Sequence, residues 1–181
     1  MPQDTGSRAI RACLSFFGIL VLILMLCIVV QVSLTALGFS TLIRIEEQLF
    51  LLGRAVTINS LMDIQWHLLV VIGLMPAALV WVLDRHVRVD FLYRTAPPRG
   101  KAGIELIGHV LFTLPFLLFC TPAAWSFAQR ALATAERSRD GGLTDRFLIK
   151  GVIPVGFALI LLVLLLDIAI QSRRLWKGDR T

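Results

Sequence analysis

The sequence predicts an all-α integral membrane protein with four transmembrane helices and an amphipathic interfacial helix between the first and second. Of the 181 residues, 57% are hydrophobic and only 17% are charged, whereas soluble domains carry about a quarter charged residues. The apolar residues come in long uninterrupted blocks instead of stripes that repeat every 3.6 residues or so, which argues against a soluble core. The net charge of +6 comes from basic residues between these blocks. That placement is typical of charges that end and orient helices, and not of a nucleic-acid-binding face.

The first apolar block predicts a retained helix. Residues 1–11 are polar, and a charge-free run of 32 residues follows from Ala12 to Ile43. A signal peptide has an apolar region of only about 7–15 residues before its cleavage site. The longer run therefore predicts a signal-anchor helix at about residues 15–37, preceded by the N-terminal segment 1–11.

The next stretch has a mixed character. Between residues 44 and 61, two arginines and two glutamates accompany apolar residues that recur at helical spacing. The apolar run between the charges is too short to cross a bilayer. We therefore predict an amphipathic helix at about residues 44–58, lying in the membrane interface or packed on a partner.

The second span organises the chain. No charged side chain occurs between Asp63 and Asp84, and the intervening residues would make about 30 Å of helix, which matches the hydrocarbon thickness of a bilayer. This predicts a span at about residues 64–83, with a bend at Pro76. The basic loop 84–101 follows, where apolar and polar residues alternate in a pattern that indicates a short extended segment.

The third and fourth spans complete the transmembrane domain. Residues 106–129 are free of charge and contain Pro115 and Pro122, which predict kinks. Paired glycines then predict a turn at Gly141-Gly142. The fourth span is predicted at about residues 147–170. The four-helix domain thus covers residues 12–172, and a basic tail follows at residues 173–181.

The distribution of basic residues predicts the orientation. An even number of spans places both termini on one side of the membrane. Eleven of the 18 Lys and Arg residues fall on the side of the termini, and seven fall in the first and third loops. Because basic residues favour the cytoplasm, both termini are predicted to be cytoplasmic.

The sequence shows no pattern of a reaction centre. The three cysteines lie in or beside apolar runs without a paired C-x-x-C motif, and they are Cys13, Cys27 and Cys120. They are interpreted as small apolar residues. Asp167 is the one candidate for an acid within a span, although the head-group region is its expected place. The sequence therefore predicts no enzyme and no cofactor.

A haem-binding bundle is the alternative interpretation. A stand-alone four-helix membrane protein that binds a cofactor such as haem b needs histidine ligands within its spans. His67 and His109 lie near opposite ends of their spans. Antiparallel helices would place them roughly 20 Å apart, which is too far to share one iron.

Three stretches carry a resemblance to a known family. They are Asp63-Ile-Gln-Trp66-His67-Leu, His86-Val-Arg-Val-Asp90-Phe-Leu-Tyr93, and Gly141-Gly142-Leu followed by the run Arg146 to Phe157. In this order, and over about residues 12–172, the chain resembles the small membrane subunit (DctQ-like small permease) of tripartite ATP-independent periplasmic (TRAP) transporters.

The resemblance implies a non-catalytic subunit of a bacterial inner-membrane complex. In this family a soluble periplasmic protein captures a carboxylate-type solute, and a large multispanning membrane subunit moves it by an elevator motion coupled to sodium. The small subunit is expected to enlarge the fixed scaffold beside the large subunit. Its implied partners are therefore the large membrane subunit, the periplasmic solute-binding protein and anionic lipids, but not nucleic acid.

Three groups of candidate functional residues follow. An interface with a partner subunit or an internal polar network is predicted at Asp63, Trp66, His67, His86, Arg88 and Asp90. For Asp63, pairing with an arginine of the large subunit stands beside a simple role at the start of the helix. Docking of the periplasmic protein is predicted at Arg137, Arg139, Asp140 and Arg146. Anchoring to lipid head groups is predicted at Trp81, Arg94, Arg99 and Lys101.

Overall fold

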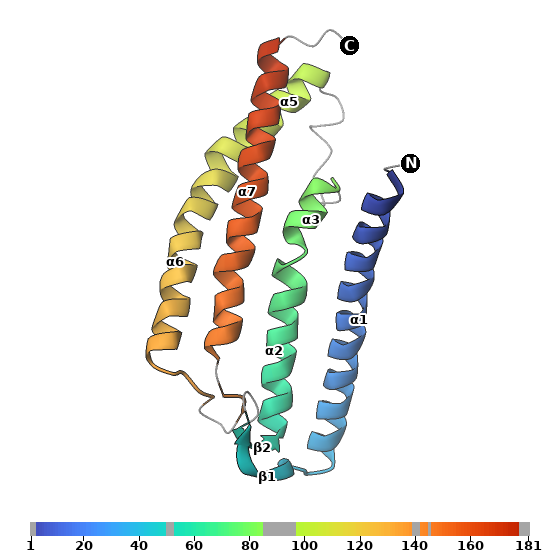
Figure 1. Ribbon diagram of the computed structural model, residues 1–181, viewed down its shortest axis with the longest axis vertical. Helices are drawn as coiled ribbons and strands as arrows, with labels where there is room; N and C mark the ends of the chain where they lie inside the picture. Colours follow the sequence, from blue (N-terminus) through green and yellow to red (C-terminus); the bar gives the residue numbers. More distant parts are fainter. Residues whose placement is uncertain (1–2, 50–52, 85–96, 139–141, 145, 178–181) are drawn as a thin grey trace. The chain divides into compact units, whose positions relative to one another are not determined.

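The computed structural model describes residues 3–49, 53–84, 97–138, 142–144 and 146–177 (Figure 1). Its contacts divide the chain into two compact units. One unit joins Met1–Pro76 with Phe127–Ile153, and the other joins Ala77–Ser126 with Pro154–Thr181. The elements, in chain order, are α1 (Gln3–Ala36), β1 (Thr41–Leu49), β2 (Gly53–Thr57), α2 (Ile58–Leu74), α3 (Ala77–Val82), α5 (Pro98–Gly108), the π-helix η1 (His109–Thr113), α6 (Leu114–Ala133) and α7 (Phe147–Lys177).

Within the described residues, four helical segments are long and apolar enough to cross a membrane, which is the predicted number. They cover Ile10–Ala36, Ile58–Val82, Gly100–Ala133 and Phe147–Arg173. Their large apolar side chains remain mostly exposed, and Leu22, Phe112 and Phe119 are examples. A helix that is apolar on all sides is typical of a lipid environment.

In the first unit, α1 and α2 are neighbours. The side-chain amide of Gln65 donates a hydrogen bond of 3.1 Å to the backbone carbonyl of Cys27. Helix α2 begins at Ile58, because Thr57 caps it: the Thr57 hydroxyl accepts from the Ser60 backbone N–H, and the Ser60 hydroxyl accepts in return from the Thr57 backbone. Asp63 therefore lies in the second turn of α2 and not at its start.

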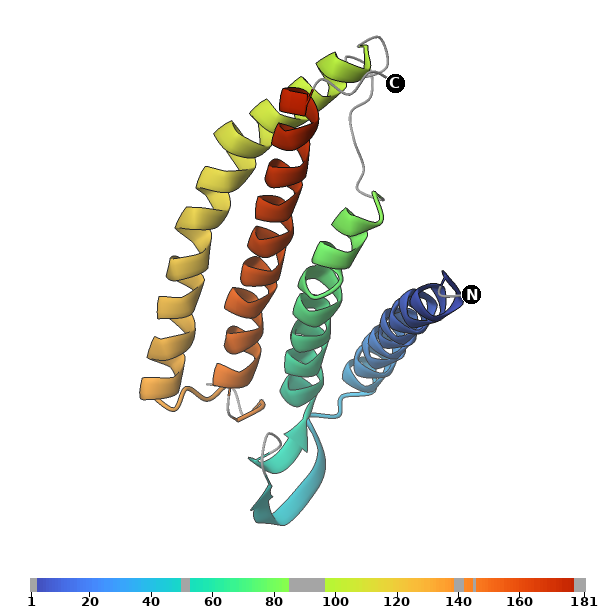
Figure 2. The same ribbon diagram turned by 45° about the horizontal axis from the view of Figure 1, so that its top comes forward.

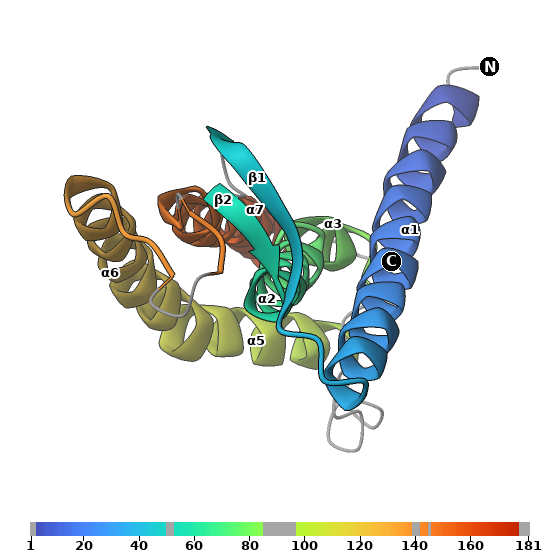
Figure 3. The ribbon, with the colours of Figure 1, turned by 90° about the horizontal axis from the view of Figure 1, so that it is seen from below.

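The predicted amphipathic helix at residues 44–58 is wrong, since β1 and β2 form an antiparallel hairpin there. Figure 2 shows the hairpin extending from the N-terminal end of α2, and Figure 3 shows the same junction viewed from below. The sequence has a high density of β-branched residues around this hairpin, such as Ile43, Val56 and Thr57. These residues favour a pleated strand over a helix. The helical spacing of the apolar residues was therefore not decisive.

Prolines mark the breaks in the helices. Helix α2 ends at Leu74 and α3 begins at Ala77, so the predicted bend at Pro76 is an interruption. Before Pro115, the helix widens into η1, where the Leu114 N–H bonds to the His109 carbonyl five residues earlier. Pro115 has no N–H, and its ring crowds the preceding turn. The wider π-turn accommodates that ring.

In the second unit, α6 and α7 share an apolar contact surface. Leu117 of α6 and Leu164 of α7 are 2% and 0% exposed. The rings of Phe116 and Phe157 meet edge to face, with their centroids 6.5 Å apart. Such pairs contribute about 0.5–1.5 kcal/mol beyond their buried area.

Candidate functional site: two interhelical polar clusters

The carboxylate of Asp63 joins the second turn of α2 to the loop between α6 and α7 (the α6–α7 loop, residues 134–146). It accepts a hydrogen bond of 3.0 Å from the backbone N–H of Leu143. One guanidinium nitrogen of Arg146 lies 3.7 Å from its other oxygen. The side chain of Asp63 is only 12% exposed, and a buried carboxylate is stable only when it is paired. Asp63, Leu143 and Arg146 are called the Asp63 cluster below.

Gly142 fits against this carboxylate because it has no side chain. A Cβ at this position would lie 2.1 Å from the Asp63 Oδ2 atom and 2.7 Å from the Ser138 hydroxyl. Both distances are far below van der Waals contact. The predicted turn at the paired glycines therefore has a packing reason at Gly142, where the backbone passes close to a buried anion. Gly141 is outside the described residues.

A second ion pair closes the α6–α7 loop. The ammonium group of Lys150, in the first turn of α7, pairs with the carboxylate of Glu136. The same ammonium lies 4.0 Å from the centroid of the Phe127 ring, within the range of a cation–π contact. Two backbone hydrogen bonds also cross the loop. The Ser138 N–H donates to the Leu143 carbonyl at 3.1 Å, and the Arg146 N–H donates to the Glu136 carbonyl at 3.2 Å. The described part of this loop is thus held at both ends.

The two aromatic neighbours of Asp63 on α2 differ in their surroundings. His67 bonds through Nδ1 to the backbone carbonyl of Asp63, one turn earlier. A carbonyl oxygen can only accept, so Nδ1 carries the proton. Trp66 is 61% exposed. Among the predicted interface residues on this helix, Trp66 therefore presents the larger free surface.

A second cluster joins α3, η1 and α7 in the other unit. The indole N–H of Trp81 donates to the Asp167 carboxylate at 3.3 Å. His109 Nδ1 lies 3.6 Å from the same oxygen, which is an electrostatic contact but too long for a hydrogen bond. The rings of Trp81 and His109 lie 5.1 Å apart at an angle of 44°. We call Trp81, His109 and Asp167 the Asp167 cluster.

One helical turn further along both helices, a second polar pair crosses the same interface. The amide of Gln171 donates to the carboxylate of Glu105, and Gln171 is only 6% exposed. Glu105 and His109 are four residues apart, as are Asp167 and Gln171. Equal spacing on two antiparallel helices brings both pairs into register. That spacing was the signal in the sequence that could have identified the cluster.

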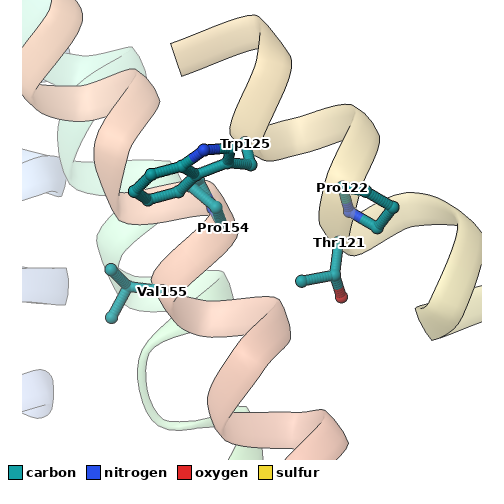
Figure 4. A pocket seen from close by; sticks show the side chains of 5 residues that line it. All are labelled: Thr121, Pro122, Trp125, Pro154 and Val155. Atoms are coloured by element: carbon teal, nitrogen blue, oxygen red, sulfur yellow. The ribbon is translucent and has the colours of Figure 1, made fainter. Parts of the chain in front are cut away.

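A pocket of about 360 Å³ lies between α6 and α7 (Figure 4). Its lining residues are Thr121, Pro122, Trp125, Pro154 and Val155. None of these lining residues is charged, and a carboxylate solute needs cationic or hydrogen-bonding partners. The pocket therefore suits hydrocarbon rather than an anionic solute.

The remaining predicted residues are placed as follows. Arg137 is exposed on the α6–α7 loop, and Lys101 is half-buried in α5. Arg99 lies in the first turn of α5. Trp176, which the sequence analysis missed, is 91% exposed near the end of α7. The candidates outside the described residues are His86, Arg88, Asp90, Arg94, Arg139 and Asp140.

The described residues contain no group of three or more His, Cys, Asp or Glu side chains that could hold a metal ion. Cys13, Cys27 and Cys120 are free thiols. The polar chemistry seen in these parts of the chain consists of interhelical hydrogen bonds and ion pairs. Its evident capacity is to join helices.

Four long apolar helices joined by polar contacts define a multi-pass membrane protein. The family model of the DctQ component of tripartite ATP-independent periplasmic transporters matches residues 50–174, which is more than half of the chain. The chain belongs to this family of non-catalytic transporter components. Membership of a tripartite transporter implies partner subunits. A comparison with curated proteins found no match.

Proposed function

We propose that this chain is the static membrane scaffold of a sodium-coupled transporter for carboxylate-type solutes. It would pack beside the large membrane subunit, which carries the solute, and provide no transport site itself. The observation that carries this proposal is how its acidic side chains are used. Each of four acidic residues is engaged by another segment of the same chain: Asp63, Glu105, Glu136 and Asp167.

Such contacts suit a frame that must not move. Polar bonds between helices contribute roughly 0.6–2 kcal/mol each in a membrane, and they fix one helix at a set depth against the next. A solute or ion site would instead need carboxylates or amides that are open to a ligand. The extensive apolar surface of the spans suits contact with lipid and with another membrane subunit.

Co-purification tests the scaffold proposal. The chain, tagged at its C-terminus, is extracted from its native membrane in mild detergent, and the co-purifying proteins are identified. A large multispanning protein in stoichiometric amount is the expected result. A monodisperse chain purified alone would contradict the proposal, and a Soret absorption band in that sample would favour the haem-binding alternative.

The proposed orientation places both termini in the cytoplasm and the α6–α7 loop in the periplasm. It is supported by the excess of basic residues on the side of the termini. Trp176 and Arg173, exposed near the end of α7, would then lie among the inner head groups together with Lys101. Single cysteines at Arg137 and Thr181, introduced into a cysteine-free variant, test this arrangement. A membrane-impermeant thiol reagent added to spheroplasts should label the first and not the second, and the opposite result would reverse the topology.

A further inference from the structure

We propose that the Asp63 carboxylate is a positioning group that holds the α6–α7 loop so that Arg137 meets an acidic surface of the periplasmic solute-binding protein. This inference rests on the proposed function, in which the loop faces the periplasm. It assigns to Asp63 a role in docking that it exerts through the loop, without touching the partner itself.

The contacts of Asp63 reach a distant segment of the chain. Asp63 belongs to α2, yet its carboxylate binds a backbone N–H eighty residues further along the chain. Because the donor is a backbone N–H, this bond fixes the position of the Leu143 backbone and not only that of a side chain. The Arg146 guanidinium, 34% exposed, adds an electrostatic contact at 3.7 Å. Together these contacts hold the loop at two points, Leu143 and Arg146.

The loop lies close against the Asp63 carboxylate. Leu143 is 1% exposed, so the residue that donates its N–H to Asp63 also buries its side chain. Gly142 approaches so closely that no Cβ has room. A loop that merely covered the helix end would not need both a buried anchor and a position restricted to glycine. These two contacts fix the position of Gly142 and Leu143 against Asp63.

The basic residues of this part of the chain differ in whether their charges are paired. Arg146 and Lys150 are paired with Asp63 and Glu136, which offsets their charges. Arg137 is exposed instead. Its backbone lies between Glu136 and Ser138, and both of these residues are held by backbone bonds across the loop. An exposed cation on a fixed backbone matches an acidic patch on a soluble partner, where such charges set orientation and association rate.

The experiment measures the Kd of the cognate solute-binding protein for the complex of this chain with its large subunit, reconstituted in nanodiscs. The variants are Asp63→Ala, Asp63→Asn, Arg137→Ala and the Asp63→Ala/Arg137→Ala double variant. Asp63→Ala and Arg137→Ala should each raise the Kd by about tenfold. The double variant should weaken binding little more than either change alone, because a displaced loop no longer presents Arg137. Asp63→Asn keeps an acceptor for the Leu143 N–H and should have a smaller effect.

Two further measurements separate positioning from general stability. Gln65→Ala, on the same helix but bonded to α1, should leave the Kd unchanged. Raising the salt concentration should reduce the difference between wild type and Arg137→Ala, since exposed charges are screened. It should reduce the difference between wild type and Asp63→Ala by the same factor.

Three results would overturn the inference. If Arg137→Ala weakens binding but Asp63→Ala and Asp63→Asn do not, the positioning role fails and the proposed function stands. If the Asp63 variants lose the large subunit, Asp63 acts in assembly and not in docking. If the wild-type complex does not bind the solute-binding protein, this inference fails, whereas the scaffold role still depends on co-purification with the large subunit.

Discussion

The carboxylate of Asp63 and the backbone N–H of Leu143 lie 3.0 Å apart across eighty residues of sequence. This bond ties the second turn of α2 to the loop that leads into α7. Arg146 reinforces it at 3.7 Å. The position of Leu143 in this loop should therefore depend on a carboxylate in a distant helix, in addition to the contacts within the loop.

Replacing Asp63 should open the loop locally. Asp63→Ala leaves the Leu143 N–H buried without an acceptor, at a cost of about 1–3 kcal/mol. Hydrogen exchange of the peptide that contains Leu143 should accelerate by roughly tenfold to a hundredfold. Peptides from the middle of α6 should serve as the internal control and exchange at the wild-type rate. Unchanged exchange at Leu143 would show that the bond does not hold the loop.

Gly142→Ala should also destabilise the loop, in this case by crowding the Asp63 carboxylate instead of removing it. The added methyl group would lie 2.1 Å from the Asp63 carboxylate, so the carboxylate or the loop must move. We expect a loss of about 1–3 kcal/mol, as for other overpacked sites. Thermal unfolding of the purified protein in detergent measures it.

Gly73→Ala is the matched control for this substitution. Nothing lies within 4 Å of a Cβ at Gly73 in α2, and alanine favours the helix by about 0.5–1 kcal/mol. Gly73→Ala should therefore leave the unfolding temperature unchanged or raise it. Equal destabilisation by both substitutions would contradict the close approach at Gly142.

The bond from Trp81 to Asp167 should appear as an energetic coupling. A double-mutant cycle with Trp81→Phe and Asp167→Ala removes the indole N–H, the carboxylate, or both. The bond is 3.3 Å long and joins the second predicted span to the fourth. We therefore expect a coupling free energy of about 1 kcal/mol. Trp125→Phe, at the apolar pocket, is the control and should show no coupling to Asp167. A coupling within error of zero for Trp81 would argue against the Asp167 cluster.

The amide of Gln65 should stabilise the pairing of α1 with α2. Gln65→Ala removes the 3.1 Å bond to the Cys27 carbonyl and should lower the free energy of unfolding by roughly 0.6–2 kcal/mol. Titration from mild detergent into dodecyl sulfate measures this value. Gln31→Ala is the matched control, because the Gln31 amide bonds to Thr35 within its own helix. A larger effect for Gln31→Ala would reverse the expectation.

The positions of the helices were largely predictable from the sequence. A charge-free run as long as the bilayer is thick leaves few alternatives to a spanning helix. The described residues contain four helices of this kind. The hairpin at Thr41–Thr57 was not predicted. Its apolar residues recur at helical spacing, whereas its β-branched residues, such as Ile43 and Val56, favour the strands that the structure shows.

The polar clusters were predictable only in part. Asp63 and Arg146 were both candidates, but in separate groups with different partners. His109 and Asp167 were each considered alone, although their spacing to Glu105 and Gln171 matches across two helices. A single sequence does not show which helices pack against each other, and the partner of an acidic side chain depends on that packing.

The sequence by itself determined that this is a multi-pass membrane protein of a transporter family, because span length and residue motifs are local properties. Only the tertiary structure decided that the carboxylates of Asp63, Glu105, Glu136 and Asp167 contact other segments of the same chain. A carboxylate in an apolar setting must find a donor, and the donors for Asp63 and Asp167 come from segments that folding alone brings near.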